Sequence, residues 1–281
     1  MKTENLQDWI GKTEERSDRL NAFPANAMAA TLNHEKLNYS DNKNLPPLWH
    51  WLYFVPIFRL SEAGYDGHAA LGDFLPPVQL PRRMWAGSRI EFLSPLKVGN
   101  EYKKKSKIKD VTAKSGRSGD LVFVTVSHEV SNGSTVCINE EHDIVYREKA
   151  TSSSVPAKLI EAPKEFDFSI DINPDPVLLF RYSALTFNGH RIHYDHPFCI
   201  GTEGYDGLIV HGPLLATLLL DGLANHKPDA VVLNFEFRAM APVFDNMKFQ
   251  VKGIEQEPGK YALWIEREDG SMAMDAKAKV K

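Results

Sequence analysis

The segment that most limits the possible folds of this chain is an apolar helix in its second half. The stretch GPLLATLLLDGL, which starts at Gly212, is apolar on nearly every side of a helix. The window around it, from Gly207 to Leu223, contains His211, Pro213 and Asp221 and is short for a membrane span. It therefore predicts a deeply buried helix preceded by a strand, and the rest of the fold must wrap around that helix.

Each half of the chain shows predicted helices first and predicted strands afterwards. Helical spacing of apolar residues occurs in AMAATLNHEKL and LWHWLYFV of the first half and in PVLLFRYSALTF of the second, where Asp175 and Pro176 fit the N-cap and first helical positions. Alternation and β-branched content predict strands in RIEFLSPLKVG, YKKKSKIKDVT, LVFVTVSHEV and TVCINEEHDIVY, and later in VVLNFEFRAMAPVF, MKFQVKGIEQE, KYALWIERED and SMAMDAKAKVK.

The segment TSSSVPAKLIEAPK, residues 151–164, has the Ser, Ala and Pro content of a linker. It predicts an N-terminal domain over 1–150 and a C-terminal domain over 165–281. A faint repeat, in which Glu-Phe precedes Pro near residues 91–95 and again near 236–242, favours duplication. The predicted fold class is α+β, a double hot-dog in which two antiparallel sheets are each wrapped around a long central helix.

Composition excludes several classes of function. The net charge of −4 gives no drive toward nucleic acid or an anionic membrane. Cys137 and Cys199 cannot build a disulfide framework, and the acidic N-terminus is unlike a signal or transit peptide, so we expect a cytoplasmic protein. Between Lys97 and Arg117 the chain carries a net charge of +6. This run indicates either a protected strand edge or a docking surface for phosphates or an acidic carrier protein.

The densest polar stretch is FNGHRIHYDH, from Phe187 to His196, directly after a predicted helix. VHGP follows it, and there Gly212 begins the apolar helix with free N–H groups and a positive dipole end. Hydration of an enoyl thioester needs a base for the water and donors for the developing enolate oxygen. The two segments together would supply both.

These residues resemble the MaoC-like dehydratases, whose pattern is D-x-N-P-[LI]-H followed by L-H-G at a helix start. Here the pattern is NGHRIH, residues 188–193, followed by VHG, residues 210–212. FLPPVQLPRRMWAGSRIEFLSPLKVGN and RYSALTFNGHRIHYD are similar to the branch that contains mesaconyl-CoA and itaconyl-CoA hydratases and type-2 hydroxyacyl-thioester dehydratases. The resemblance implies one degenerate and one catalytic hot-dog half.

By the same resemblance, His193 is the catalytic histidine and the Gly212 N–H binds the thioester oxygen. Asn188 stands where the family has aspartate, and since an amide cannot carry a proton at neutral pH, we expect it to position water. Arg191 replaces the family's proline, and it either grips a distal carboxylate of the substrate or forms an internal salt bridge. Tyr194 and His211 are further predicted substrate-binding residues.

The predicted activity is reversible hydration of a branched C5 dicarboxylic acyl-CoA, with citramalyl-CoA as the hydrated form. The alternatives are a 3-hydroxyacyl-thioester dehydratase of fatty-acid synthesis and a non-catalytic acyl-thioester-binding protein. A thioesterase would need a carboxylate where Asn188 stands. No cofactor is expected beyond the CoA thioester substrate, and a homodimer is possible. A metal site is the rival interpretation of His190, His193, Asp195 and His196, but Arg191 would place a cation beside the ion.

Overall fold

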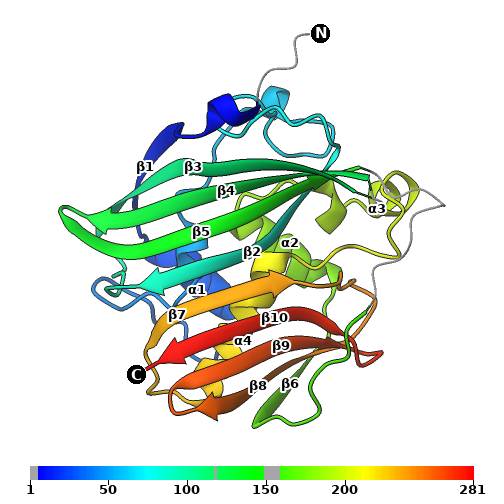
Figure 1. The fold of residues 1–281 in the computed structure, drawn as a ribbon. Helices are drawn as coiled ribbons and strands as arrows, with labels where there is room; N and C mark the ends of the chain where they lie inside the picture. The colour runs from blue at the N-terminus through cyan, green and yellow to red at the C-terminus, as the bar shows by residue number, and fades with distance from the viewer. Residues whose placement is uncertain (1–5, 117–118, 149–158) are drawn as a thin grey trace.

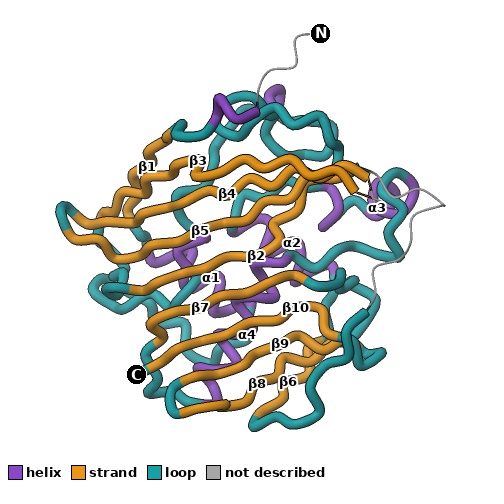
Figure 2. Tube along the Cα trace, viewed as in Figure 1, coloured by secondary structure: helices purple, strands orange, loops and turns teal. Residues whose placement is uncertain are grey.

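The computed structural model describes residues 6–116, 119–148 and 159–281. Its strands form one ten-stranded antiparallel sheet in the order β1-β3-β4-β5-β2-β7-β10-β9-β8-β6, with the helices gathered on one face (Figures 1 and 2). The strands are β1 Thr13–Arg19, β2 Arg82–Phe92, β3 Glu101–Gly116, β4 Gly119–Asn132, β5 Thr135–Arg147, β6 Phe168–Ile172, β7 Val232–Ala239, β8 Phe249–Glu257, β9 Lys260–Arg267 and β10 Met272–Val280. The α-helices are α1 Ala22–Thr31, α2 Pro176–Leu185, α3 His196–Gly201 and α4 Gly212–His226.

The sheet is built from two halves with the same strand order. In the first half, β3, β4 and β5 lie between β1 and β2, and in the second half β8, β9 and β10 lie between β6 and β7. The halves join where β2 pairs with β7, so the two Glu-Phe markers of the sequence repeat lie on adjacent strands. The predicted duplication is therefore visible in the topology, although its two sheets are fused into one.

The predicted apolar helix is α4, and the second half of the sheet wraps around it. Most of its residues are buried, and its closest strand neighbours are β8, β6 and β9. A side chain added at Gly222 would meet Val251 Cγ1 at 2.9 Å and Phe168 Cε2 at 3.2 Å. Glycine at this position lets the helix approach the sheet closely.

The first half has no comparable long helix among its described residues. The helix expected over AMAATLNHEKL begins earlier, as α1, and ends at Thr31, because Asn33 adopts a left-handed conformation with φ of 59°. LWHWLYFV forms only a short 3-10 helix, Trp49–Leu52, since Leu48 before it and Phe54 after it also have positive φ. The expectation of a long central helix in each half was thus wrong for the first half.

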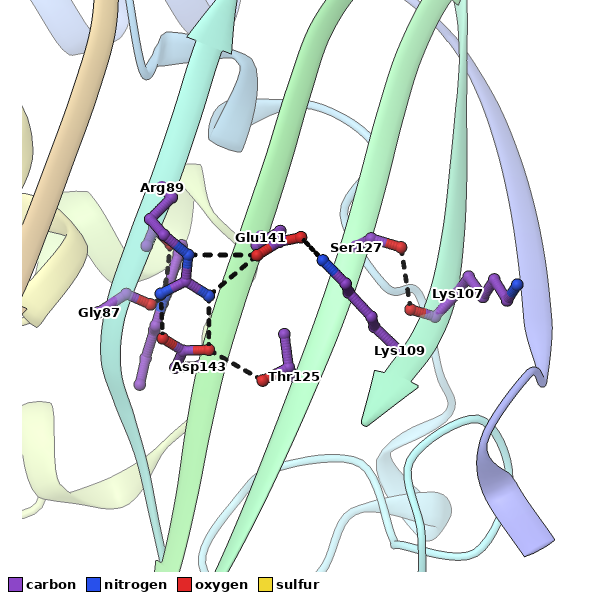
Figure 3. Close-up of polar contacts among 10 residues, drawn as sticks. Gly87, Arg89, Lys107, Lys109, Thr125, Ser127, Glu141 and Asp143 are labelled. Atoms are coloured by element: carbon purple, nitrogen blue, oxygen red, sulfur yellow. Dashed lines mark hydrogen bonds and ion pairs between the residues drawn. The ribbon is translucent and has the colours of Figure 1, made fainter. Parts of the chain in front are cut away.

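The lysine-rich segment lies on β3, which is not the edge strand along its first part. β1 covers β3 there, pairing Thr13 with Lys107 through Arg19 with Glu101. Farther along, Lys109 contacts Glu141, which also accepts from Arg89 at 3.0 Å, on a surface where charges of both signs alternate (Figure 3). The edge-protection interpretation was therefore wrong for residues 101–107.

The proposed linker lies mainly on residues 149–158, outside the described part of the chain, so the domain boundaries stay a prediction. None of the described helices is long and apolar enough to cross a membrane.

Candidate active site

The site begins where α2 ends. Phe187 adopts a left-handed conformation, with φ of 50°, and the Asn188 N–H donates to Ser183 O at 2.8 Å. The Asn188 side-chain oxygen then accepts from the His190 N–H at 3.0 Å and fixes the turn into the short 3-10 helix Arg191–His193. Because the oxygen is used in the turn, the amide NH₂ is the group that Asn188 can offer to a ligand.

His193 is held in one tautomer. Its Nδ1 lies 2.7 Å from Ile209 O, and a carbonyl can only accept, so Nδ1 carries the proton. Nε2 therefore keeps a lone pair; it has no partner among the described residues and is not one of the fully occluded polar atoms. Burial lowers the pKa of His193 to about 3, against the hydrogen bond to Ile209. The ring is a neutral base with one free nitrogen.

His211 lies behind this base and does not reach the pocket. Its ring is fully buried and stacks on His193 with centroids 3.6 Å apart, while its Nε2 lies 2.8 Å from Ser183 Oγ. Burial, with the charges of His193 and His190, holds the pKa of His211 well below its usual range. In this structure the predicted substrate residue therefore supports the base as an uncharged ring.

Gly212 lies at the first turn of α4, directly after His211. Its N–H has no backbone acceptor within the described chain, and the following Pro213 has no N–H. A side chain added at Gly212 would meet only Trp85 O, at 3.8 Å. The start of a 15-residue helix thus presents an open donor at its positive end, as required for a developing oxyanion.

A pocket of about 410 Å³ opens next to these groups and draws its wall from both halves of the chain. Asn188, Gly189 and Pro213 come from the catalytic motif, whereas His68, Arg83 and Trp85 come from the first half. His193 and His211 are not part of the wall itself. Sequence reasoning missed His68 because residues 63–81 have almost no regular structure by which to place them. It missed Arg83 and Trp85 because the predicted strand began only at Arg89, whereas β2 begins at Arg82.

Two neighbouring histidines extend the site beyond His193. The ring of His190 lies 5.5 Å from that of His193 and 4.1 Å from that of His68, which in turn holds Asp66 through Nδ1 at 2.9 Å. Ligand-type atoms of Asp66, His68 and His190 lie within 4.8 Å of one another. Of the four residues weighed as metal ligands, only His190 belongs to this group, because Asp195 is bound to Arg191 and His196 is exposed.

Arg191 has the contacts of an internal salt bridge. Its guanidinium binds Asp195 at 2.8 and 2.9 Å, donates to Tyr65 O at 3.0 Å and lies over the ring of Phe198. It does not line the pocket. Tyr194 is half exposed and donates to Gly189 O at 3.1 Å, also outside the pocket wall. The structural alternative stated for Arg191 describes what its side chain does here.

Arg83 is a cation that the sequence interpretation gave no role. It is half-buried on β2, lines the pocket and lies beside the Tyr146 hydroxyl, whose pKa is raised by burial and lowered in part by Arg83. Arg83 forms no ion pair with a carboxylate among the described residues. Its charge is one cause of the lowered pKa values of His68 and His190, which places it close to the histidine group. The signal was available in PRRMW, where two arginines begin a strand of the resembling segment.

Comparison with known proteins decides the family. The family of type-2 hydroxyacyl-thioester dehydratases matches residues 48–245. The chain belongs to this dehydratase family. A curated relative, the mesaconyl-C(4)-CoA hydratase of Chloroflexus aurantiacus, is 42% identical over 98% of both chains. The resemblance drawn from residues 188–193 and 210–212 is confirmed.

Solved structures agree with the fold of this type-2 dehydratase family member. A MaoC-like dehydratase from Phytophthora capsici superposes with a TM-score of 0.70 at 15% identity, covering 100% of this chain and 99% of the other. A Mycobacterium tuberculosis protein described as a double hot-dog gives 0.60 at 12% identity, covering 96% of each chain. The double hot-dog prediction is confirmed, and the protein is a hydro-lyase.

Proposed function

We propose that this hydro-lyase reversibly hydrates the C=C bond of a branched C5 dicarboxylic acyl-CoA, such as mesaconyl-CoA or itaconyl-CoA, with citramalyl-CoA as the hydrated form. The observation that carries the hydration is the pairing of a neutral, open His193 Nε2 with the free Gly212 N–H at the start of α4. These are the base and the oxyanion donor that the reaction requires.

The reaction starts with water held beside His193, with the Asn188 amide as a donor to the water oxygen. In a conjugated thioester such as mesaconyl-CoA, the water oxygen bonds to the β-carbon, His193 Nε2 takes a proton from the water, and the π electrons move to the thioester oxygen. The Gly212 N–H stabilises that oxygen in the enolate. The α-carbon then accepts a proton, which completes the addition and restores the thioester carbonyl.

The dicarboxylic class is supported by two independent observations. The relative at 42% identity is named for a mesaconyl thioester. Arg83 offers a guanidinium in the pocket wall, near the histidine group, that has no carboxylate partner among the described residues, and a substrate carboxylate on the β-carbon would compensate its charge. Arg83 therefore takes over the substrate role first considered for Arg191.

A rate comparison tests this function. Mesaconyl-CoA, itaconyl-CoA and crotonyl-CoA are offered to the purified protein. Loss of the conjugated enoyl absorbance measures hydration of mesaconyl-CoA and crotonyl-CoA, and chromatography of the citramalyl-CoA formed measures hydration of itaconyl-CoA, whose double bond is not conjugated with the thioester. We expect kcat/KM for a C5 dicarboxylic thioester to exceed that for crotonyl-CoA by about a hundredfold, because a buried charged contact is worth a few kcal/mol. Arg83→Met should remove most of this preference, and Arg191→Met, the matched control, should keep it. Equal efficiency on both classes would refute the dicarboxylic assignment.

The fatty-acid dehydratase remains the second candidate, because the matching family is named for hydroxyacyl-thioester dehydration. Efficient turnover of crotonyl-CoA and longer enoyl thioesters, with poor turnover of dicarboxylic ones, would favour it. Binding of all of them without turnover would indicate the non-catalytic acyl-binding protein.

A further inference from the structure

The loop Asp66–His68 of the first half is built tightly onto the catalytic motif of the second. The Arg191 N–H donates to Asp66 O at 2.8 Å. Gly67 has φ of 88°, and a side chain there would meet Gly189 O at 2.0 Å. Only glycine at position 67 allows the loop to pack this closely against Gly189, so the sequence specifies the position of the loop.

Asp66 and His68 form a carboxylate–imidazole pair. His68 Nδ1 lies 2.9 Å from Asp66 Oδ2, and the His68 backbone N–H donates to Oδ1 at 3.0 Å. Burial would raise the pKa of Asp66, but the hydrogen bond and charge of His68 outweigh it and hold the carboxyl ionised. His68 therefore directs Nδ1–H toward Asp66, and Nε2 has no partner among the described residues.

His68 is also the histidine of this group that faces the substrate space. It lines the pocket, whereas His190 and His193 do not, and the three rings succeed one another at centroid distances of 4.1 and 5.5 Å. Hydration needs one group to take a proton from water and a route by which a proton reaches the α-carbon. Asn188, in the place of an acidic residue, can carry no proton.

We propose that His68, oriented by Asp66, is the second proton-transfer residue of the site and delivers the proton to the α-carbon. The proton that His193 Nε2 takes from water passes through His190 to His68 Nε2, where the Asp66 carboxylate stabilises the imidazolium. The C–H bond forms at the α-carbon as the His68 N–H bond breaks, and the enolate electrons make that bond. All three histidines end neutral, so no co-reactant is consumed. This inference rests on the proposed hydration.

The test compares His68→Gln with the wild-type protein in both reaction directions. We expect kcat to fall by about 10²–10⁴, the range typical of general acid–base groups, while KM changes less than about threefold. Dehydration of the hydroxyacyl thioester labelled with deuterium at the α-carbon should also show a larger isotope effect in His68→Gln, since α-proton removal becomes slower. A purely structural defect would lower kcat without raising that effect.

Three variants make the outcome unambiguous. Asp66→Asn tests the positioning residue and should lower kcat less than His68→Gln while shifting the pH profile, because the imidazolium loses its carboxylate. His68→Asn replaces His68→Gln if the latter does not fold, and His196→Gln, which changes an exposed histidine, is the control that should keep wild-type kcat.

A His68 variant that keeps more than half of wild-type kcat and an unchanged isotope effect would overturn the proposal. So would one equivalent of tightly bound metal in the purified protein, because Asp66, His68 and His190 would then serve the ion. If the wild-type protein turns over no enoyl thioester at all, it is the proposed function that fails, and the isotope experiment is not reached.

Discussion

At the scale of single residues, the chemistry of the site depends on which atoms of each side chain already make hydrogen bonds within the protein. The proton of His193 lies on the nitrogen bound to Ile209 O, and the Asn188 oxygen is spent on the His190 N–H. What remains for chemistry is one lone pair on His193 and one NH₂ on Asn188. Substitutions at both positions test these two groups.

His193→Ala should lower kcat by at least 10², because the lone pair that accepts the water proton is lost. The fold should persist, since the backbone contact of this turn, from the His193 N–H to His190 O, does not depend on the side chain. Turnover is measured with a saturating enoyl-CoA, and circular dichroism checks the fold. A variant with more than about a tenth of wild-type turnover would exclude His193 as the base.

At position 188, Asp and Ala should behave differently. Asn188→Asp keeps an oxygen for the His190 N–H and gains an acceptor toward water, so it should retain activity with an altered pH profile. Asn188→Ala loses both the turn contact and the water contact, and its kcat should be about a hundredfold lower than that of Asn188→Asp. If Asp proves as inactive as Ala, the NH₂ donates a bond that the reaction requires.

At the scale of elements, α4 combines an open end with a tightly packed middle. Its first residue, Gly212, has room for a side chain, whereas Gly222 touches strands β8 and β6. The same element thus begins with an N–H that has no backbone acceptor in the described chain and closes the core of the second half.

Replacing each of the two glycines of α4 by alanine should therefore affect the free energy of unfolding differently. Gly212→Ala should leave the free energy of unfolding nearly unchanged, while Gly222→Ala should lower it by about 1–3 kcal/mol through overpacking, despite the better helix propensity of alanine. Urea unfolding of both variants measures this. Equal free energies of unfolding of the two variants would mean that the sheet does not pack closely against the helix at Gly222.

At the scale of the whole molecule, the two halves are held together by backbone pairing between two strands and by a buried ion pair. β2 and β7 pair from Gly87–Arg238 to Glu91–Asn234, and Arg82 binds Glu203 at 3.0 Å with both side chains buried. The pocket and the histidine group lie across this junction. The stability of the whole and the state of the site are therefore linked.

This linkage predicts a dependence of stability on pH. Burial depresses the pKa of His193 to about 3 and that of His211 in the same direction. As pH falls, the histidines of the unfolded chain, with a pKa of about 6.5, bind protons before those of the folded protein do. The contribution of these groups to the free energy of unfolding is therefore fully present above about pH 6.5 and is lost as pH falls toward the folded pKa. Each group contributes about 1.4 kcal/mol per pH unit in that window.

Urea unfolding at pH 7.5 and pH 5 tests the sign. The free energy of unfolding should be lower at pH 5, and His196→Gln, which alters an exposed histidine, should show the same difference as the wild type. A free energy that stays constant between the two pH values would contradict the neutral, buried state of His193 and His211.

The sequence predicted most of the longer strands but missed the two strands at the sheet edges, β1 and β6. β6, FSIDI, alternates apolar and polar residues but is only five residues long. Both ends of β5 and the start of α4 lie within a residue of the predicted positions. β1, with sequence TEERSDR, has no apolar residue to reveal a buried face, and its pairing with β3 is long-range. Boundaries that depend on a single backbone conformation, such as the left-handed Asn33 after α1, were also missed.

The motif in the sequence was enough to name three candidate residues in the second half. His193, Asn188 and Gly212 lie on the turns that follow α2 and begin α4, and their roles stay a prediction from the resemblance. His68 and Arg83 could not be placed, since only the tertiary fold brings them to residues more than a hundred positions away. The periodicity of apolar residues along the chain carries no information about such tertiary contacts.

The β2–β7 junction has a consequence for how such a protein can change over time. In a symmetric dimer of single hot-dog subunits, every substitution appears twice, so one sequence must serve both as catalyst and as wall. Joining two copies in one chain removes that constraint. One copy can keep the base and the oxyanion donor, while the other gives up its central helix and is free to acquire a pocket fitted to a particular acyl group.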